Sequence, residues 1–463
     1  MMTASRIRPR LSAGVLLLLA LTLPLVSGCD DESLTAPEVQ NDRFNSYVAL
    51  GNSITAGFQA DGINQTLQQQ SYAVRLADQM NTPFGIPALQ DPGCPPPLTN
   101  IFPPERTVPL EEITPPGCAL RSSPTPTQLN NVAVPGAWIQ DALTNSAAAG
   151  AHPNELTSFI LGGKTQVEAA MEANPSFATV WLGNNDVLRA ALAGDPSLST
   201  SASNFSSRYT RVLDSLEAAG AENGALGSVA NVTLIPNLSP GQAYAAAESR
   251  INQLGQQRAA NDGDPNTSWG SYSVAASCAS GPSATQSRIS FRYGFEGLFT
   301  LALSGQDVEL DCTDNRILAE IYGQGTLDQV GIGSLGALSV LTAPETQQLV
   351  ERLQTYNTFL QSEADDRGWA YVDVNAALGA LYNAGTETPN DPSDDLVPKF
   401  PNLAPDQPTF GQFFSEDGVH PSSSTHQVVT NLFVEAINDE YDTSLQTIDA
   451  PDVPGSQRSN REL

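Results

Sequence analysis

The sequence predicts an α/β fold in which helices cover a mostly parallel β-sheet. Short apolar segments that suit buried strands alternate with longer segments whose apolar residues recur at helical spacing. The expected strands are residues 47–50, 131–134, 178–182, 232–235 and 369–374. The expected helices are residues 71–81, 163–173, 205–219, 343–366 and 425–440. Because strands and helices alternate along the chain, we expect an α/β sandwich with crossover helices packed on the sheet.

The first elements rest on apolar spacing. Residues 47–50 are an apolar run that opens the folded part of the chain. Four apolar side chains share one side of the helix expected over 71–81: Tyr72, Val74, Leu76 and Met80. Residues 131–134 and 178–182 are again short, strand-like runs, and the helical pattern of 163–173 lies between them.

The later elements follow the same rule. In residues 205–219, apolar side chains recur at helical spacing: Tyr209, Val212, Leu213 and Leu216. The strand expected at 232–235 is broken by Pro236. A helix over 343–366 starts with Thr342-Ala343-Pro344, which suits a helix N-terminus. The remaining expected elements are the strand 369–374 and the helix 425–440.

Three insertions interrupt this pattern, at about residues 82–127, 259–340 and 375–412. The first is Pro-rich and irregular, which is typical of a long surface loop. The second is rich in Gly, Ser and Asp, with short apolar alternations that suggest a hairpin or two. We expect all three to shape the substrate pocket. Residues 442–463 are expected to form a flexible tail.

The N-terminus carries an export signal. Arginines at 6, 8 and 10 precede an apolar run over residues 11–26, which is too short to span a membrane. The run ends in Leu25-Val26-Ser27-Gly28-Cys29, which resembles the lipobox of bacterial lipoproteins. This resemblance implies a signal peptide over 1–28, lipidation of Cys29, a tether over 29–45, and an anchor in the bacterial cell envelope, at the periplasmic or surface face of the outer membrane. A plain secretory peptide is the alternative.

The other cysteines are expected to form disulfides. Cys94, Cys118, Cys278 and Cys312 allow three pairings, and local pairing is the economical one in an exported chain: Cys94 with Cys118, and Cys278 with Cys312. Zinc binding is the rival, but neither a C-x-x-C pair nor a His cluster supports it. We therefore expect no metal.

The charge balance is strongly acidic. Fifty Asp and Glu residues against 21 Lys and Arg give a formal net charge of −29. Such a surface repels nucleic acid, so no nucleic-acid partner is expected. Lysine occurs only at 164 and 399. This composition is typical of proteins that work in concentrated salt, where the Debye length is about 3 Å at molar ionic strength, but also of an ordinary acidic extracellular protein.

Two motifs carry groups suited to nucleophilic catalysis. Gly51-Asn52-Ser53 follows the first strand, and a Ser at a strand-to-helix turn projects its hydroxyl and its own N–H above the sheet edge. A helix N-cap is its alternative role. In Asp417-Gly418-Val419-His420-Pro421, the three-residue spacing lets Asp417 reach His420 Nδ1 while Nε2 faces the nucleophile. The alternative is a solvent-exposed turn histidine.

Two further motifs could supply donors for an oxyanion. Val134-Pro135-Gly136-Ala137 follows a strand, and its glycine lets backbone approach a ligand closely. Gly183-Asn184-Asn185-Asp186 also follows a strand, where an Asn side chain can donate to a developing oxyanion. Ordinary turn chemistry accounts equally well for either motif taken alone.

In their order along the chain, from Gly51 to Pro421, the four motifs resemble the sequence blocks of the SGNH (GDSL-type) esterase and lipase superfamily. The resemblance implies a three-layer α/β/α sandwich, flavodoxin-like, over residues 46–441. It implies Ser53 as nucleophile, His420 as base and Asp417 as the residue that orients it. The oxyanion hole would comprise the N–H groups of Ser53 and Gly136 and the side chain of Asn185. One position departs from the family pattern, because Asn52 stands where an Asp is usual.

The resemblance implies two-step acyl transfer from an ester, with no cofactor. The substrate could be a lipid or an acylated glycan, and the oligomeric state is left open. A non-catalytic surface lipoprotein that keeps the fold as a binding module is the alternative from a different class. The two remaining histidines, His152 and His426, are expected to be structural or solvated.

Overall fold

The computed structural model describes residues 39–113, 121–123, 125–262, 267–384, 396–403 and 407–453. The expected signal peptide, Cys29, most of the tether and Cys118 lie outside these residues. The chain divides into residues 1–36 and residues 37–463, and only the second unit is described below.

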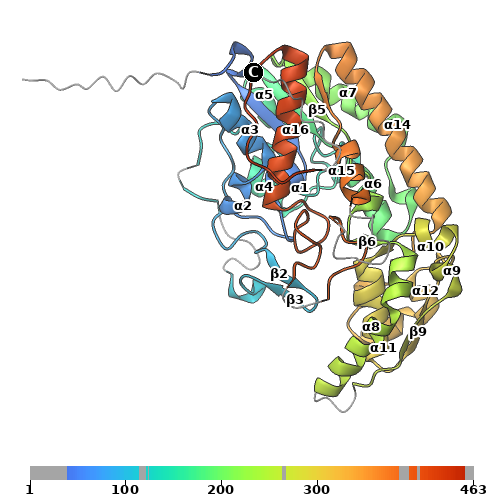
Figure 1. Cartoon of the computed structure of the whole chain (residues 1–463). Helices are drawn as coiled ribbons and strands as arrows, with labels where there is room; N and C mark the ends of the chain where they lie inside the picture. The colour runs from blue at the N-terminus through green and yellow to red at the C-terminus, as the bar shows by residue number, and fades with distance from the viewer. Residues whose placement is uncertain are drawn as a thin grey trace, which may run out of the picture. The chain divides into compact units, whose positions relative to one another are not determined.

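A four-stranded parallel sheet forms the centre of this unit (Figure 1). Its strands, in spatial order, are β1 (Tyr47–Gly51), β4 (Phe177–Trp181), β5 (Asn223–Gly227) and β10 (Ala370–Val372). All three neighbouring pairs are parallel. In β1, Val48 and Leu50 pack on one face while Tyr47 and Ala49 pack on the other. The predicted α/β fold with a mostly parallel sheet is therefore confirmed.

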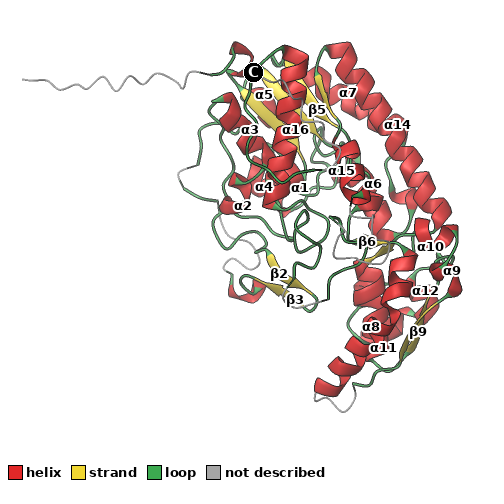
Figure 2. Cartoon of the chain, viewed as in Figure 1, coloured by secondary structure: helices red, strands yellow, loops and turns green. Residues whose placement is uncertain are grey.

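Helices cover both faces of the sheet (Figure 2). One apolar core contains side chains of α5 (Gln166–Glu172), α6 (Asn185–Ala193), α7 (Ala202–Ala218) and α14 (Ala343–Arg367). The opposite core contains side chains of α3 (Tyr72–Met80) and α16 (Ser423–Tyr441). Five of these six helices lie where apolar periodicity predicted them, so the sheet lies between two helical layers.

The prediction of a strand at residues 232–235 is wrong. Val232–Leu234 is a 3-10 helix, and β5 is the third strand of the sheet instead. Its sequence Asn-Gly-Ala-Leu-Gly resembles a turn, because glycine is depleted in strands. The glycines are needed for packing: a Cβ on Gly224 would lie 2.4 Å from the ring of Trp369. Close packing across the sheet here overrides intrinsic strand propensity.

The strand expected at residues 131–134 forms only in part. This buried segment runs beside β1 with a single parallel bridge, between Ala49 and Asn131. Two more backbone bonds follow, from Val132 N–H to Ala49 O (3.0 Å) and from Val134 N–H to Gly51 O (3.3 Å). The segment thus accompanies β1 to its carboxyl end.

The first insertion contains a hairpin. Strands β2 (Leu98–Ile101) and β3 (Pro104–Arg106) pair in antiparallel fashion within it. Between the sheet and this hairpin, the chain forms the short helices α1 (Ser53–Ala56) and α2 (Gln65–Gln69). A further helix, α4 (Glu155–Leu161), precedes α5.

The second insertion is not a loop with hairpins, and that expectation is wrong. The long helix α8 (Gly241–Asn261) leads into it, and this helix and the insertion share one apolar core. Strands β7 (Ser271–Val274) and β9 (Asp307–Leu310) pair in parallel, because helices connect them. The remaining elements are β6 (Leu238–Ser239), α9 (Ala276–Ala279), α10 (Pro282–Gln286), β8 (Ile289–Ser290), the π-helix Arg292–Phe299, α11 (Thr300–Leu303), α12 (Leu318–Tyr322) and α13 (Gln324–Gln329).

One disulfide closes this insertion. Cys278 and Cys312 are bonded, with their Cα atoms 5.1 Å apart, so this predicted pairing is confirmed. Cys94 is also disulfide-bonded. Its expected partner, Cys118, lies outside the described residues, and that pairing stays a prediction.

The end of the chain packs more than predicted. The expectation of a loose tail from 442 is wrong for residues 442–453, because Leu445 and Val453 are buried. Two asparagines of α16 bind this segment: Asn438 Nδ2 donates to Leu445 O, and Asn431 Nδ2 donates to Ile448 O, each at 2.9 Å. The third insertion begins as the helix α15 (Val374–Asn383). Within the described ranges, no helix is both long and apolar enough to cross a membrane.

Candidate active site

Ser53 lies where β1 ends and α1 begins. Asn52 caps this helix, since its Oδ1 accepts a hydrogen bond from Ile54 N–H at 3.2 Å. Gly57, with φ of +84°, ends the helix after one turn. The Ser53 side chain therefore lies at the carboxyl edge of the parallel sheet, where ligand sites of such sheets are found. Nδ2 of Asn52 is buried and has no partner among the described residues.

Ser53, His420 and Asp417 are joined by hydrogen bonds. Ser53 Oγ lies 2.9 Å from His420 Nε2, and His420 Nδ1 lies 2.7 Å from Asp417 Oδ2. The hydroxyl, the imidazole and the carboxylate thus form one continuous chain. A base in contact with the nucleophile, itself oriented by a carboxylate, is the arrangement that activates a serine.

A tight turn brings Asp417 and His420 together. Asp417 Oδ1 accepts hydrogen bonds from Val419 N–H at 2.8 Å and from His420 N–H at 2.9 Å. Gly418 has φ of +67° and packs against the ring of Phe410, where a Cβ would lie 2.8 Å away. A side chain at 418 would strain the turn, so the Asp-Gly-x-His spacing fixes the geometry locally.

Electrostatics favour an ionised carboxylate and a basic imidazole. Burial alone would raise the pKa of Asp417, but the charge of His420 and hydrogen bonds from its ring and backbone outweigh it and lower the pKa to about 2. Burial alone would lower the pKa of His420, but the Asp417 charge and hydrogen bond raise it above its ordinary value. At neutral pH the pair is therefore suited to accept a proton from Ser53.

The turn at residues 60–61 supports Asp417 from the other side. Asp61 N–H donates to Asp417 Oδ2 at 2.7 Å. The Asp61 carboxylate pairs with Arg106 of β3 at 2.5 Å, and Arg106 Nη1 also donates to the Asp61 carbonyl at 2.8 Å. Ala60 and Asp61 both have left-handed backbone, with φ of 52° and 50°. Through Arg106, the hairpin of the first insertion therefore fixes the turn at residues 60–61, whose Asp61 N–H binds the Asp417 carboxylate.

Sequence reasoning missed Asp61 and Arg106. Asp61 is 356 residues from Asp417 and 45 from Arg106, and no motif links them. Asn237 is a further missed residue: its Nδ2 donates to the Asp417 carbonyl at 2.8 Å. These contacts join segments that are far apart in the chain, and a single sequence has no signal for them.

The residues expected to form an oxyanion hole line the same cleft as Ser53 and His420. Gly136 has φ of +80°. Within the described part of the chain, the N–H groups of Ser53 and Gly136 donate to no other residue. Asn185 Nδ2 donates to the Ala137 carbonyl at 2.9 Å, which holds the amide at the start of α6. Both backbone donors thus remain available to a ligand.

The cleft has a volume of about 610 Å³. Apolar side chains form much of its lining: Phe58, Leu98, Ile101, Leu188 and Leu192. Charged groups also face it, and they form two pairs, Asp61 with Arg106 and Glu296 with Arg292. The ring of Phe58 lies 4.9 Å from that of His420, between centroids.

The other two histidines lie outside this cleft. His426 is fully buried in α16, and its Nδ1 accepts a hydrogen bond from Tyr72 N–H of α3 at 3.2 Å. Burial lowers the pKa of His426 to about 3, so this ring stays neutral. The ring of His152 stacks on Trp138, with centroids 4.5 Å apart. Among the described residues, no cluster of three or more His, Cys, Asp and Glu side chains could hold a metal ion.

Comparison with known proteins identifies the family. The sequence model of the family described as GDSL-like Lipase/Acylhydrolase matches residues 47–291. The chain belongs to this family. It is accordingly a serine carboxylic-ester hydrolase, and the predicted SGNH/GDSL relationship is confirmed. The match includes Ser53, Gly136 and Asn185 and ends before Asp417.

Two further comparisons complete the picture. Among solved structures, the chain is similar to a mutant of Axe2, an acetyl-xylooligosaccharide esterase from Geobacillus Stearmophilus. The TM-score is 0.33 and the identity 11%, over 84% of this chain and 93% of that one. A search of curated proteins finds no match.

The acid limb of the pH–rate profile tests the role of Asp61. The Asp61 charge helps to raise the pKa of His420, which must be neutral to act as a base. In Asp61→Asn the backbone donor to Asp417 remains, and Asn tolerates the left-handed conformation. We expect the acid limb of kcat/KM for 4-nitrophenyl acetate to move to lower pH.

The matched control is Glu105→Gln, which removes an exposed carboxylate of the same hairpin that does not line the cleft. It should leave the acid limb in place. An acid limb that stays or moves to higher pH in Asp61→Asn would contradict this account.

Proposed function

We propose that this GDSL-family hydrolase cleaves carboxylic esters by two-step acyl transfer at Ser53. The observation that carries the proposal is the unbroken hydrogen-bond chain from Ser53 Oγ through His420 to Asp417. Serine, histidine and aspartate so connected supply nucleophile, general base and orienting carboxylate.

In the first step, Ser53 Oγ attacks the ester carbonyl carbon while His420 Nε2 takes the hydroxyl proton. The carbonyl oxygen becomes an oxyanion, which accepts hydrogen bonds from Ser53 N–H, Gly136 N–H and the Asn185 amide. The bond from carbon to the alcohol oxygen then breaks. The imidazolium gives its proton to that oxygen, and the alcohol leaves an acyl-enzyme behind.

In the second step, His420 takes a proton from water as the water oxygen attacks the acyl carbon. The resulting oxyanion uses the same donors. Collapse releases the carboxylic acid and returns the proton to Ser53 Oγ. Asp417, with its pKa lowered to about 2, stays ionised throughout and stabilises the imidazolium of each step.

Substitution of the nucleophile tests this assignment. Ser53→Ala should lower kcat for 4-nitrophenyl acetate by about 10⁶-fold, because the three residues act as a unit. Ser203→Ala, which alters an exposed serine of α7, serves as the control and should keep wild-type activity. Retention of a substantial fraction of activity in Ser53→Ala would rule out this nucleophile. A folded wild-type protein without any esterase activity would favour the binding-module alternative.

We also propose that the protein is exported and anchored in the bacterial cell envelope by a lipid on Cys29. The support is the sequence Leu-Val-Ser-Gly-Cys after a basic and apolar leader. Two acyl chains or more on one residue give stable membrane attachment, whereas one chain gives only marginal binding.

Fractionation of cells tests the anchor. The wild-type chain should be found with membranes and carry a mass increase on a mature N-terminal Cys29. Cys29→Ala should remove both the mass increase and the membrane association. A wild-type chain recovered without lipid from the soluble fraction would show that the leader is a plain secretory peptide.

A further inference from the structure

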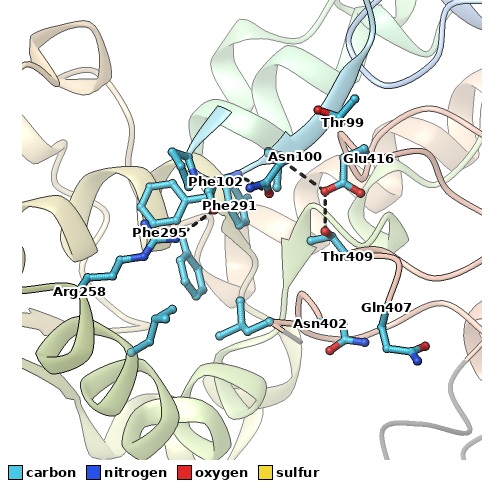
Figure 3. A pocket seen from close by; sticks show the side chains of 14 residues that line it. Thr99, Asn100, Phe102, Arg258, Phe291, Phe295, Asn402, Gln407, Thr409 and Glu416 are labelled. Carbon is cyan, nitrogen blue, oxygen red and sulfur yellow. Dashed lines mark hydrogen bonds between the residues drawn. The ribbon is translucent and has the colours of Figure 1, made fainter. Parts of the chain in front are cut away.

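A second pocket adjoins the catalytic cleft (Figure 3). Its volume is about 390 Å³, and it lies among the β2–β3 hairpin, α8, the π-helix and residues 402, 403, 407, 409 and 416. Ile101 of β2 lines both this pocket and the cleft. Glu416, which lines the pocket, directly precedes Asp417 in the chain. The two spaces are therefore neighbours that share Ile101.

The pocket has one aromatic wall and one polar wall. Figure 3 shows Phe102, Phe291 and Phe295 gathered on one side. The rings of Phe291 and Phe295 stack with centroids 5.2 Å apart, and Phe102 meets both rings edge-on. Apart from Arg258, the rest of the lining contains six polar side chains and four aliphatic ones: Thr99, Asn100, Asn402, Gln407, Thr409 and Glu416, and Ile101, Pro103, Leu254 and Leu403.

Hydrogen bonds hold two of the polar side chains in place and leave each with an atom that can bind a ligand. Glu416 Oε1 accepts from Thr409 Oγ1 at 2.5 Å and from Ile101 N–H at 3.4 Å. Asn100 Oδ1 accepts from Phe102 N–H at 3.2 Å. Among the described residues, Glu416 Oε2 and Asn100 Nδ2 have no partner. The pocket thus offers one oriented acceptor and one oriented donor.

Arg258 supports the aromatic wall. Its guanidinium lies 4.4 Å from the centroid of the Phe102 ring, and Nη2 donates to the Phe102 carbonyl at 3.1 Å. Arg258 forms no ion pair within the described part of the chain. Its remaining N–H groups are further donors at the edge of the pocket.

An aromatic wall that faces polar side chains favours a sugar ring over an alkyl chain as the part of an ester substrate bound in this pocket. An alkyl chain in the pocket would desolvate a carboxylate and several amides without replacing their hydrogen bonds, which costs free energy. A sugar ring has C–H faces that pack on aromatic rings and hydroxyls that both donate and accept. Such a ligand satisfies both walls at once.

We propose that this pocket binds a sugar residue of an acylated glycan whose ester group is hydrolysed at Ser53. The proposal rests on the function proposed above and narrows its substrate to glycan esters. The sugar ring lies against Phe102, and one of its hydroxyls donates a hydrogen bond to the Glu416 carboxylate. Asn100 and Arg258 donate hydrogen bonds to its oxygens. Pocket and cleft together then accommodate two neighbouring parts of one glycan chain.

Kinetics with two kinds of ester test the pocket. The probes are partly O-acetylated oligosaccharides of xylose, glucose and N-acetylglucosamine, against 4-nitrophenyl acetate, which has no sugar. For the best oligosaccharide, the ratio of kcat/KM on the sugar ester to that on 4-nitrophenyl acetate should fall at least about fivefold in Glu416→Gln and in Asn100→Ala, mainly through KM. The matched control Glu105→Gln should keep the wild-type ratio.

Three kinetic outcomes would overturn the subsite. The first is a ratio that neither pocket variant changes. The second is hydrolysis of 4-nitrophenyl acetate without hydrolysis of any of the three sugar esters. The third is a selective loss of activity on 4-nitrophenyl palmitate in detergent micelles, which would show that the pocket takes an acyl chain. A wild-type protein that hydrolyses none of these esters would instead contradict the proposed function.

Binding without catalysis keeps the subsite testable in that last case. Calorimetry with the unmodified tetrasaccharides of the same three sugars should give, for at least one, a dissociation constant of about 1 mM or tighter in the Ser53→Ala protein. Adding Glu416→Gln should raise this dissociation constant at least about fivefold. Absence of binding for all three, or equal binding in both proteins, would overturn the proposal.

Discussion

The hydrogen bond between His420 Nε2 and Ser53 Oγ joins two residues that are 367 positions apart in the chain. The fold makes this contact possible because the parallel sheet presents the end of β1 at one edge, and α16 packs on the face beside it. Tyr72 N–H of α3 donates a hydrogen bond to His426 Nδ1 of α16, and the ring of Tyr72 stacks on Phe433 of α16 with centroids 4.7 Å apart. Helix α16, which follows His420, is thereby fixed against α3.

The insertions complete the site that the sheet begins. The first insertion delivers Arg106 to Asp61, and Asp61 N–H binds the carboxylate of Asp417. From the segment that leads into the second insertion, Asn237 binds the carbonyl of Asp417. The same two insertions, with the segment before Asp417, form the pocket next to the cleft. The segments that position the Asp417 carboxylate therefore also form the pocket that we propose binds the substrate.

Sequence alone predicted what local chemistry determines. The apolar spacing gave helices around the sheet. Short motifs after strands gave Ser53, Gly136 and Asn185, and the motif in the turn before α16 gave Asp417 and His420. Prediction from the sequence failed where packing between distant segments determines the structure. Gly224 makes β5 look like a turn although the ring of Trp369 requires that glycine. Helix α8 has only three large apolar side chains, Tyr244, Ile251 and Leu254, and the contact of Asp61 with Asp417 has no motif.

Covalent inactivation tests the central claim most directly. Diethyl 4-nitrophenyl phosphate reacts with a serine that is activated by a neighbouring base, and the adduct can be located by peptide mass spectrometry. The account predicts one diethylphosphoryl group per chain, on Ser53, formed in step with loss of esterase activity and absent in His420→Ala. Modification of a different serine, or full inactivation with Ser53 unmodified, would contradict it.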